Sequence, residues 1–416
     1  MVAEDEFREA WPHVVRVVAS WCGSLDAAEE YAAEAFSRAV AQARPPDDVT
    51  AWCVQVAKRA YLDDRRRSET FHRLAPSVAE QRTRTATAVD DDTDPDDVAT
   101  GLDDRLALLF VACDDALPAG AQMVLALRVV CGLTIAQVAH HLGIQPTAAA
   151  ARLTRAKAAL ASARGEFDVP GPGERRRRLP VVLDCLAGMF TVAHRDELLP
   201  PDAVTDTAGH ALSIADALVN EFPSEPEVRA LRALVLLGLA RRPGRVDGEG
   251  VALTLDEVDR RRWDRRLVEA GLADAARATD LLGESPPGRY VLEATISGLH
   301  TVARSVEETD WSAILTMYDA LGATWPSPAV RVARLAARAR AEPGRTDEVE
   351  AELARLTEEG PSYARRDAAF ALADLHWRTG RREQAAAAYS TLAELTQSEP
   401  VRRFCLRRAS DSAGPP

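Results

Sequence analysis

The sequence is poor in aromatic residues and has no alternating strand pattern and no long apolar run. Phe, Tyr and Trp make up 5% of the 416 residues, which disfavours a β-sheet protein. The longest apolar stretch, residues 233–240, is too short to cross a bilayer. The N-terminal residues MVAEDEF lack the basic and apolar parts of a signal peptide. We therefore expect an all-α, cytoplasmic protein without a membrane partner.

Metal-binding and catalytic patterns are also missing. The six cysteines stand singly among apolar residues, without CxxC spacing, which favours buried reduced thiols over a zinc site. The only adjacent histidines, His140 and His141, point in different directions on a helix, so packing explains them better than metal binding. No HExxH motif, phosphate loop or nucleophile elbow occurs. We expect no enzyme activity, no catalytic residue, no metal and no cofactor.

The sequence also does not contain more basic than acidic residues. The formal net charge is −13, whereas a protein that binds DNA unaided usually carries many cations to contact phosphates. Residues 1–168 by themselves hold more acidic than basic side chains, and part of this excess is an aspartate-rich stretch at 90–97. That stretch is either a solvated tether or a mimic of nucleic acid in a basic channel.

The most informative segment runs from Thr134 to Lys157. Thr134 and Gln137 have the spacing of a capping box, which predicts a helix start. Gly143 then supplies a sharp turn, and Pro146 suits the first turn of a second helix. These signals predict a helix-turn-helix, with an ordinary helical hairpin as the alternative.

The second predicted helix has an apolar and a polar side. Apolar spacing assigns Ala149, Leu153 and Ala156 to its inner side. In a helix-turn-helix, the second helix lies in the DNA major groove. The side chains left for outside partners are those of Thr147, Arg152, Arg155 and Lys157.

The N-terminal segment from Phe7 to Arg67 has the pattern of several amphipathic helices. One of them carries a face of four carboxylates at helical spacing, namely Asp26, Glu29, Glu30 and Glu34. A later one begins near Ala51-Trp52 and ends in a basic stretch that contains Lys58, Arg59, Arg65, Arg66 and Arg67.

The order of these features resembles sigma factors of the extracytoplasmic-function type. The resemblance implies that the four carboxylates bind the coiled coil of the beta-prime subunit of core RNA polymerase. It also implies that Lys58, Arg59 and Arg65–Arg67 melt and read the minus-ten element of promoter DNA. Residues from Leu117 to Lys157 are similar to region four, so Thr147, Arg152, Arg155 and Lys157 would contact the minus-thirty-five element.

The C-terminal part is similar to the sigma-factor subfamily that carries a tetratricopeptide-like domain. The likeness lies in residues 259–264 (DRRRWD), 309–311 (TDW), 318–321 (YDAL) and 326–328 (PSP). One tetratricopeptide-like repeat is legible between Phe370 and Leu392, with Gly380 in its turn. Such hairpins present a concave surface to a protein or peptide ligand, or they only pack on the sigma regions; the sequence leaves both open.

Two departures from the family pattern concern DNA contacts. Arg59 stands where related factors have an asparagine. Positions that usually offer polar side chains to bases are Ala148 to Ala151, and alanine can contact only thymine methyl groups.

Breaker residues predict five segments. They are sigma region two at 1–75, an acidic flexible linker at 76–101, region four at 102–168, a hinge at 169–178 and a tetratricopeptide-like domain at 179–410. The run Arg175–Arg178 contacts nucleic acid, contacts the acidic half of the chain, or is a solvated helix start. We expect a sigma factor whose C-terminal helices regulate or scaffold it. The alternative is a degenerate, sigma-like adaptor whose repeats bind a protein partner.

Overall fold

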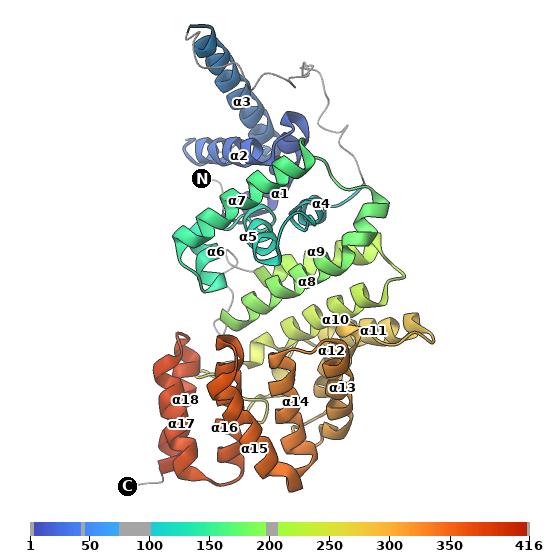
Figure 1. The fold of residues 1–416 in the computed structure, drawn as a ribbon, viewed down its shortest axis with the longest axis vertical. Coiled ribbons are helices and arrows are strands. Elements are labelled where there is room, and N and C mark those ends of the chain that lie inside the picture. Colours follow the sequence, from blue (N-terminus) through green and yellow to red (C-terminus); the bar gives the residue numbers. More distant parts are fainter. Residues whose placement is uncertain (1–3, 43–45, 75–100, 197–206, 414–416) are drawn as a thin grey trace. The chain divides into compact units, whose positions relative to one another are not determined.

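The computed structural model describes residues 4–42, 46–74, 101–196 and 207–413 (Figure 1). These residues form helices without any strand, and a single isolated antiparallel bridge pairs Val246 with Ala252. The prediction of an all-α protein is therefore confirmed. The aspartate-rich stretch at 90–97 lies outside the described residues. Contacts divide the chain into two compact units, one up to Val192 and one from Ala211 onward.

The first unit contains the segments that resemble sigma regions two and four. In its described residues, three helices form an N-terminal bundle, and three short helices followed by two long ones complete the unit. Their bounds are α1 (Glu4–Cys22), α2 (Leu25–Val40), α3 (Val49–Leu74), α4 (Asp104–Ala112), α5 (Ala119–Val129), α6 (Ile135–Leu142), α7 (Pro146–Arg164) and α8 (Pro172–Asp196).

The N-terminal bundle is held by apolar faces at helical spacing. Trp11 of α1 is 1% exposed and packs against Phe7 and Phe36, with ring centroids 5.4 and 5.9 Å away. Small residues on α2, including Ala28, Ala32 and Ala35, are fully buried and allow α1 and α3 to approach. Trp11 and Phe36 therefore belong to the core of the bundle, where each buries a large apolar area.

Helix α8 differs from the hinge expected at 169–178. Residues 172–178 form its first two turns, and Arg178 is 3% exposed. The Arg178 guanidinium donates to the Asp114 carboxylate over 2.6 Å and to the carbonyl of Phe110 over 2.9 Å. Of the three alternatives for the basic run, Arg178 follows the one in which it contacts the acidic half of the chain. The physical reason is that the helical period turns it inward, where it must be paired.

The ion pair of Asp114 is central to this end of the first unit. Burial opposes ionisation of Asp114, but hydrogen bonds from Arg164 and the Ala116 N–H, with the Arg178 charge, outweigh it and lower its pKa. A buried ion pair adds little net stability, yet removing one partner leaves an uncompensated charge. Asp114 thus ties α4 and α7 to the start of α8.

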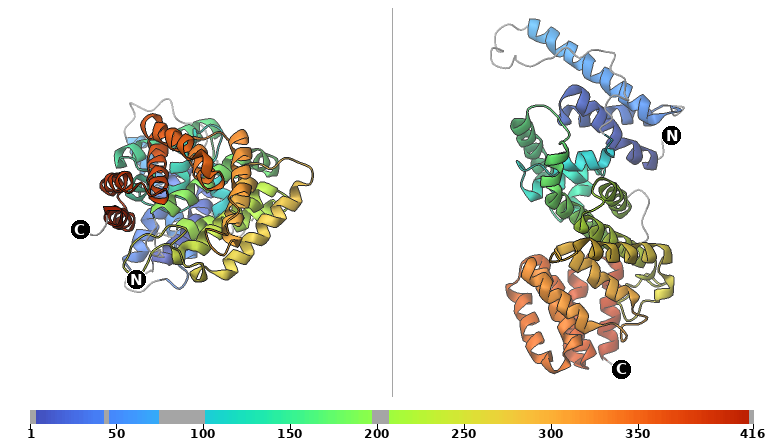
Figure 2. Two further views of the ribbon diagram at one scale, coloured as in Figure 1. Left: turned by 90° about the horizontal axis from the view of Figure 1, so that it is seen from below. Right: turned by 90° about the vertical axis from the view of Figure 1, so that its right-hand side faces the viewer.

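The second unit is a succession of helices that lie beside their sequence neighbours (Figures 1 and 2). Helix α9 (Thr207–Glu221) crosses the boundary between the two units. The following elements are α10 (Pro226–Arg241), η3 (Arg242–Gly244), η4 (Arg260–Arg262), α11 (Arg265–Leu282), α12 (Arg289–Val302), α13 (Trp311–Thr324), α14 (Pro328–Ala341), η5 (Pro343–Arg345), α15 (Thr346–Glu359), α16 (Ser362–Arg378), α17 (Arg382–Leu395) and α18 (Glu399–Ala413).

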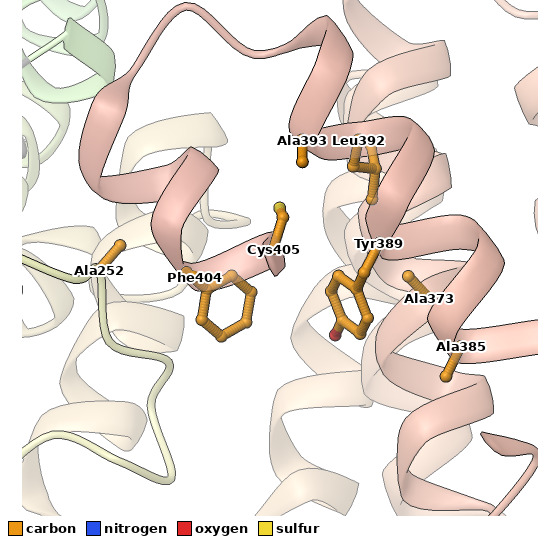
Figure 3. Packing of buried hydrophobic residues seen from close by; sticks show 8 residues of the cluster. All are labelled: Ala252, Ala373, Ala385, Tyr389, Leu392, Ala393, Phe404 and Cys405. Carbon is orange, nitrogen blue, oxygen red and sulfur yellow. The ribbon is translucent and has the colours of Figure 1, made fainter. Parts of the chain in front are cut away.

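The C-terminal hairpin forms where one repeat is legible in the sequence. Helices α16 and α17 are joined at Gly380, whose φ of 74° is the left-handed conformation that glycine adopts without a steric penalty. Tyr389 is 2% exposed and meets Phe404 of α18 edge to face, with centroids 5.6 Å apart (Figure 3). Around these rings pack Ala373, Ala385, Leu392 and Cys405.

Two further expectations concern membranes and thiols. Among the described residues, none of the helices combines the length and the apolar character that a transmembrane span requires. All six cysteines are free; five are buried, and Cys22 is half-buried. The prediction of buried reduced thiols therefore holds for five of the six.

Replacing Asp114 tests the ion pair at the start of α8. We expect Asp114→Ala to lower the free energy of unfolding by about 3 kcal/mol at pH 7, because the buried Arg178 then keeps only the half-buried Glu174 as a carboxylate partner. Asp115→Ala, at the exposed neighbouring position, should change it by less than about 0.5 kcal/mol. Urea unfolding followed by circular dichroism measures both.

The same pair has a defined pH dependence. Because the folded-state pKa of Asp114 is lowered, its contribution is complete above its ordinary pKa of 3.8 and is lost as pH falls through the folded value. The difference between wild type and Asp114→Ala should therefore narrow below pH 3.8. Equal losses for Asp114→Ala and Asp115→Ala at pH 7 would show that the pair does not hold α8.

Candidate functional site

The helix-turn-helix forms as the sequence predicts. The backbone N–H of Gln137 donates to the Thr134 hydroxyl over 3.2 Å, and the backbone N–H of Thr134 donates to the Gln137 side chain over 2.8 Å. This capping box begins α6, and Gly143 ends it in the left-handed conformation, with a φ of 61°. Pro146 is in the first turn of α7. The angle between the two helices thus depends on residues recognisable from the sequence.

Helix α7 has the two sides expected of it. Ala149, Leu153 and Ala156 are buried, and Leu160 continues this inner side. The side chains of Thr147, Arg152 and Arg155 are exposed, together with Ala150 and Ala151. The outer side therefore combines two guanidinium groups with an alanine surface that donates no hydrogen bond.

Lys157 is turned toward α2 instead of toward solvent. Its ammonium group lies 2.8 Å from an oxygen of Asp26 and 2.5 Å from an oxygen of Glu29. Glu29 is only 5% exposed and also pairs with Arg128 of α5. A carboxylate removed from water needs such partners, so Glu29 joins α2 to α5 and α7.

The four carboxylates of the acidic face of α2 therefore differ in exposure and in pairing. Asp26 is exposed but pairs with Lys157, whereas Glu29 is buried. Glu30 and Glu34 face solvent, and Glu34 pairs with Arg38 one turn further along the same helix. Of the four carboxylates at helical spacing, three remain accessible to an outside partner.

A cavity of about 480 Å³ lies beside the basic end of α3. Trp21 of α1 lines it together with Lys58, Arg59 and Arg66, and the Lys58 ammonium lies 5.5 Å from the centroid of the Trp21 ring. Tyr61 packs edge to face on Trp21, with centroids 5.4 Å apart. An aromatic ring flanked by cations suits an unstacked base and its phosphate.

Arg65, Arg66 and Arg67 form ion pairs with carboxylates one turn away on α3. Arg65 lies 3.2 Å from Glu69, Arg66 lies 3.8 Å from Asp63, and Arg67 lies 3.9 Å from Asp64. Exposed pairs of this kind contribute at most about 1 kcal/mol, so the guanidinium groups can exchange them for phosphates at little cost.

Trp21 and Arg128 were not singled out from the sequence. Trp21 follows Trp11 by ten residues, which places it about 80° around the helix from the buried tryptophan and hence at the edge of the core. This rotation could have marked Trp21 as half-buried. No local signal marks Arg128, because its partner Glu29 is 99 residues away in the sequence.

Comparisons with known proteins match two parts of the chain. Residues 108–160 match the model of Sigma-70, region 4, from within α4 to near the end of α7. Residues 178–279 match a family of unknown function (DUF6596).

One relative covers most of the chain. The sequence is 34% identical over 341 residues to the uncharacterized protein R00370 of Rhizobium meliloti strain 1021. The alignment spans 80% of this chain and 78% of that protein. No solved structure matches significantly.

The pairing of Glu29 can be tested by its removal. We expect Glu29→Ala to lower the free energy of unfolding of the first unit by about 3 kcal/mol, because Lys157 and Arg128 then lack a buried carboxylate. Glu30→Ala is the matched control on the exposed side of α2 and should change it by less than about 0.5 kcal/mol. Denaturant unfolding at low and high salt is the measurement. A loss for Glu29→Ala that disappears at high salt would mark the pair as a screened surface contact.

Proposed function

We propose that this chain, which belongs to the same family as the Rhizobium meliloti protein, is a bacterial sigma factor. The premise is that it carries a sigma-70 region 4. It would be of the extracytoplasmic-function type, directing core RNA polymerase to specific promoters and assisting promoter melting without chemistry of its own. The observation that carries the proposal is the region 4 match, which falls on a helix-turn-helix with an exposed, arginine-bearing second helix.

Helix α7 would approach the minus-thirty-five element. Arg152 and Arg155 are three residues apart, so they share one helix face and can reach neighbouring phosphates. Ala150 and Ala151 offer only methyl groups, which suits apolar contact with thymine. Binding at this element would depend more on phosphates than on base edges.

The cavity beside α3 would take a base of the minus-ten element. Trp21 supplies an aromatic face, while Lys58, Arg59 and Arg66 supply positive charge beside it. Stacking of one base on an aromatic side chain contributes about 1–3 kcal/mol, which helps to offset the cost of unstacking that base in the duplex. Arg65 and Arg67 would follow the backbone of the melted strand.

Core polymerase would dock on the acidic face of α2. Asp26, Glu30 and Glu34 are exposed there, and a basic coiled coil of the beta-prime subunit complements them. The same coiled coil would compete with Lys157 and Arg128 for Glu29. Docking would therefore loosen α7 from α2 and release Lys157 toward DNA. Delivery by polymerase also accommodates the net charge of −13.

The C-terminal helices would regulate or scaffold the factor as a tetratricopeptide-like domain. The hairpin of α16 and α17 has the Gly380 turn and the buried Tyr389 of such a repeat. A rigid second surface lowers the entropy lost on assembly, which favours an activating role.

A degenerate, sigma-like adaptor is the second candidate. The observation in its favour is that Ala150 and Ala151 leave α7 without hydrogen-bond donors at two exposed positions. In that case the C-terminal helices, rather than α7, would hold the partner, and that partner would be a protein.

Run-off transcription separates the two candidates. With purified core polymerase and the region upstream of its own gene, the wild-type protein should yield a discrete transcript. Arg152→Ala and Arg155→Ala should each reduce binding to all promoters alike, and the slope of log affinity against log salt should become shallower by about one unit. Arg345→Ala, an exposed arginine of the second unit, should change neither.

Two outcomes would count against this proposal. The absence of any transcript with folded wild-type protein would favour the adaptor. A loss confined to one promoter sequence would show that Arg152 or Arg155 reads a base instead of a phosphate.

A truncation tests the activating role of the second unit. The cut belongs after Asp196, at the end of α8, because a cut before Arg178 would remove the partner of Asp114. We expect residues 1–196 to direct less transcription than the full chain, measured at equal concentrations of folded protein. A truncated protein more active than the full chain would identify the second unit as an inhibitor.

A further inference from the structure

The second unit has a cavity of about 630 Å³, open to solvent on one side, that the proposed promoter contacts do not use. Its walls come from the end of α10, from the segment before α11, and from α12 to α18. A volume of this size lies within the range of roughly 300–1,000 Å³ that is typical of small-molecule sites. We call it the arginine cavity, after Arg241, Arg245, Arg340 and Arg378, which line it.

Aromatic side chains form much of the remaining wall. Trp311 and Tyr318 of α13 line the cavity, as do Trp263, Phe370, Tyr389 and Phe404. Figure 3 shows Tyr389 and Phe404 facing one another from α17 and α18. Trp311 also lies under the guanidinium of Arg340, 4.9 Å from its ring centroid, and 5.2 Å from the ring of His300. Cationic and aromatic groups are therefore interleaved on the same surface.

The cations of the arginine cavity outnumber its carboxylates. Among the carboxylates that the structure describes, only those of Asp256 and Asp374 line it. Asp374 lies 3.0 Å from Arg378 and 3.8 Å from Arg340, and Asp256 lies 3.8 Å from Arg408. Both carboxylates are thus already engaged. Within the described part of the chain, Arg241 has no carboxylate partner at ion-pair distance, although it is partly buried.

The pKa values of groups in and beside the cavity reflect this excess of positive charge. Burial, and then the charges of Arg241, Arg260 and Arg340, lower the pKa of His300 to about 4. Burial, and then Arg245 and Arg260, lower the pKa of Arg241 to about 10. Glu307 and Glu308 act on Arg260 in the opposite direction, yet burial keeps its pKa lowered. The positive potential is therefore only partly offset by the protein's own carboxylates.

Several buried nitrogens at this site also lack a hydrogen-bond partner. They are Nδ1 of His300, Nε1 of Trp263 and Nη2 of Arg260. Arg260 is held beside His300 because its other guanidinium nitrogen donates to the carbonyl of His300 over 2.8 Å and to that of Ala303. An unpaired buried polar group costs about 1–3 kcal/mol. His300 and Trp263 line the cavity, so a hydrogen-bond acceptor bound there would satisfy their nitrogens.

Three of the four segments that resemble the C-terminal subfamily contribute residues to this cavity, whereas residues 326–328 line a different one. Asp259, Asp264 and Asp310 cap η4, α11 and α13 and so set the positions of these elements. From the same motifs, Trp263, Trp311 and Tyr318 reach the cavity wall, and Arg260 lies against Trp263. Trp263 and Trp311, 48 positions apart in the sequence, thus line the same cavity. Capping of the helices does not by itself require these side chains to meet.

We propose that the arginine cavity binds a small organic anion with one carboxylate or phosphate group and an aromatic body. Arg241, Arg340 and His300 hold the anionic group, and Trp311, Tyr318 and Tyr389 contact the body. This function is separate from promoter recognition and does not rest on it.

Calorimetric titration of the full-length protein with three probes tests the proposal. The probes are benzoate, phenyl phosphate and inorganic phosphate. We expect benzoate or phenyl phosphate to bind at least tenfold more tightly than inorganic phosphate, because the aromatic wall contributes only to the organic anions. Whether the site prefers a carboxylate or a phosphate follows from which of benzoate and phenyl phosphate binds more tightly. Quenching of tryptophan fluorescence should accompany binding, since Trp311 and Trp263 line the site.

Two variants and a control make the result specific. Arg241→Gln and Arg340→Gln should each weaken binding at least tenfold, whereas Arg345→Gln, on the exposed η5, should leave it unchanged. Arg241→Gln should unfold at the same or a higher temperature than wild type without ligand, because it removes a partly buried charge that lacks a carboxylate partner. A purely structural arginine would instead destabilise the protein when replaced.

Three results would overturn the proposal. One is the absence of heat with all three probes, and another is equal binding to wild type and Arg241→Gln. The third is preference for an acidic, leucine-containing peptide over both aromatic anions, which would identify a groove for a protein partner.

Discussion

The pairing of Glu29 with Lys157 and Arg128 is the interaction on which the arrangement of the first unit depends. It joins the acidic helix α2 to α5 and α7, which belong to the segment that matches sigma-70 region 4. A buried carboxylate is stable only while its cations stay with it, so the contact is specific but contributes little net stability. Such a contact holds the two segments together through a single carboxylate.

Asp114 has a related role at the other end of this unit. Its ion pairs with Arg164 and Arg178 bring the end of α7 and the start of α8 to α4. Helix α8 is therefore part of the first unit and not a flexible connection. The charges of the second unit are arranged differently. Arginines line a cavity whose two carboxylates already form ion pairs. Paired charges organise the first unit, and incompletely offset charges mark a site in the second.

The predictions from sequence succeeded where the signal is local. The capping box of Thr134, the Gly143 turn and the inner side of α7 are confirmed, because each depends on residues within a few positions of one another. The all-α architecture follows from composition and helical spacing for the same reason. The roles assigned to Arg152, Arg155 and the basic residues of α3 stay predictions, supported by their exposure and by the cavity beside Trp21.

By itself, the sequence determined the bounds of α6, the start of α7 and the apolar side of α7, because these depend on residues a few positions apart. Only the tertiary structure decided which helix covers a given side. Lys157 has the spacing of an outward residue, yet Asp26 and Glu29, about 130 positions earlier, turn it inward. Arg178 continues a basic run, yet Asp114 buries it. The arginine cavity is likewise assembled from helices far apart in the chain. The spacing of residues within one helix does not predict which distant helices will contact it.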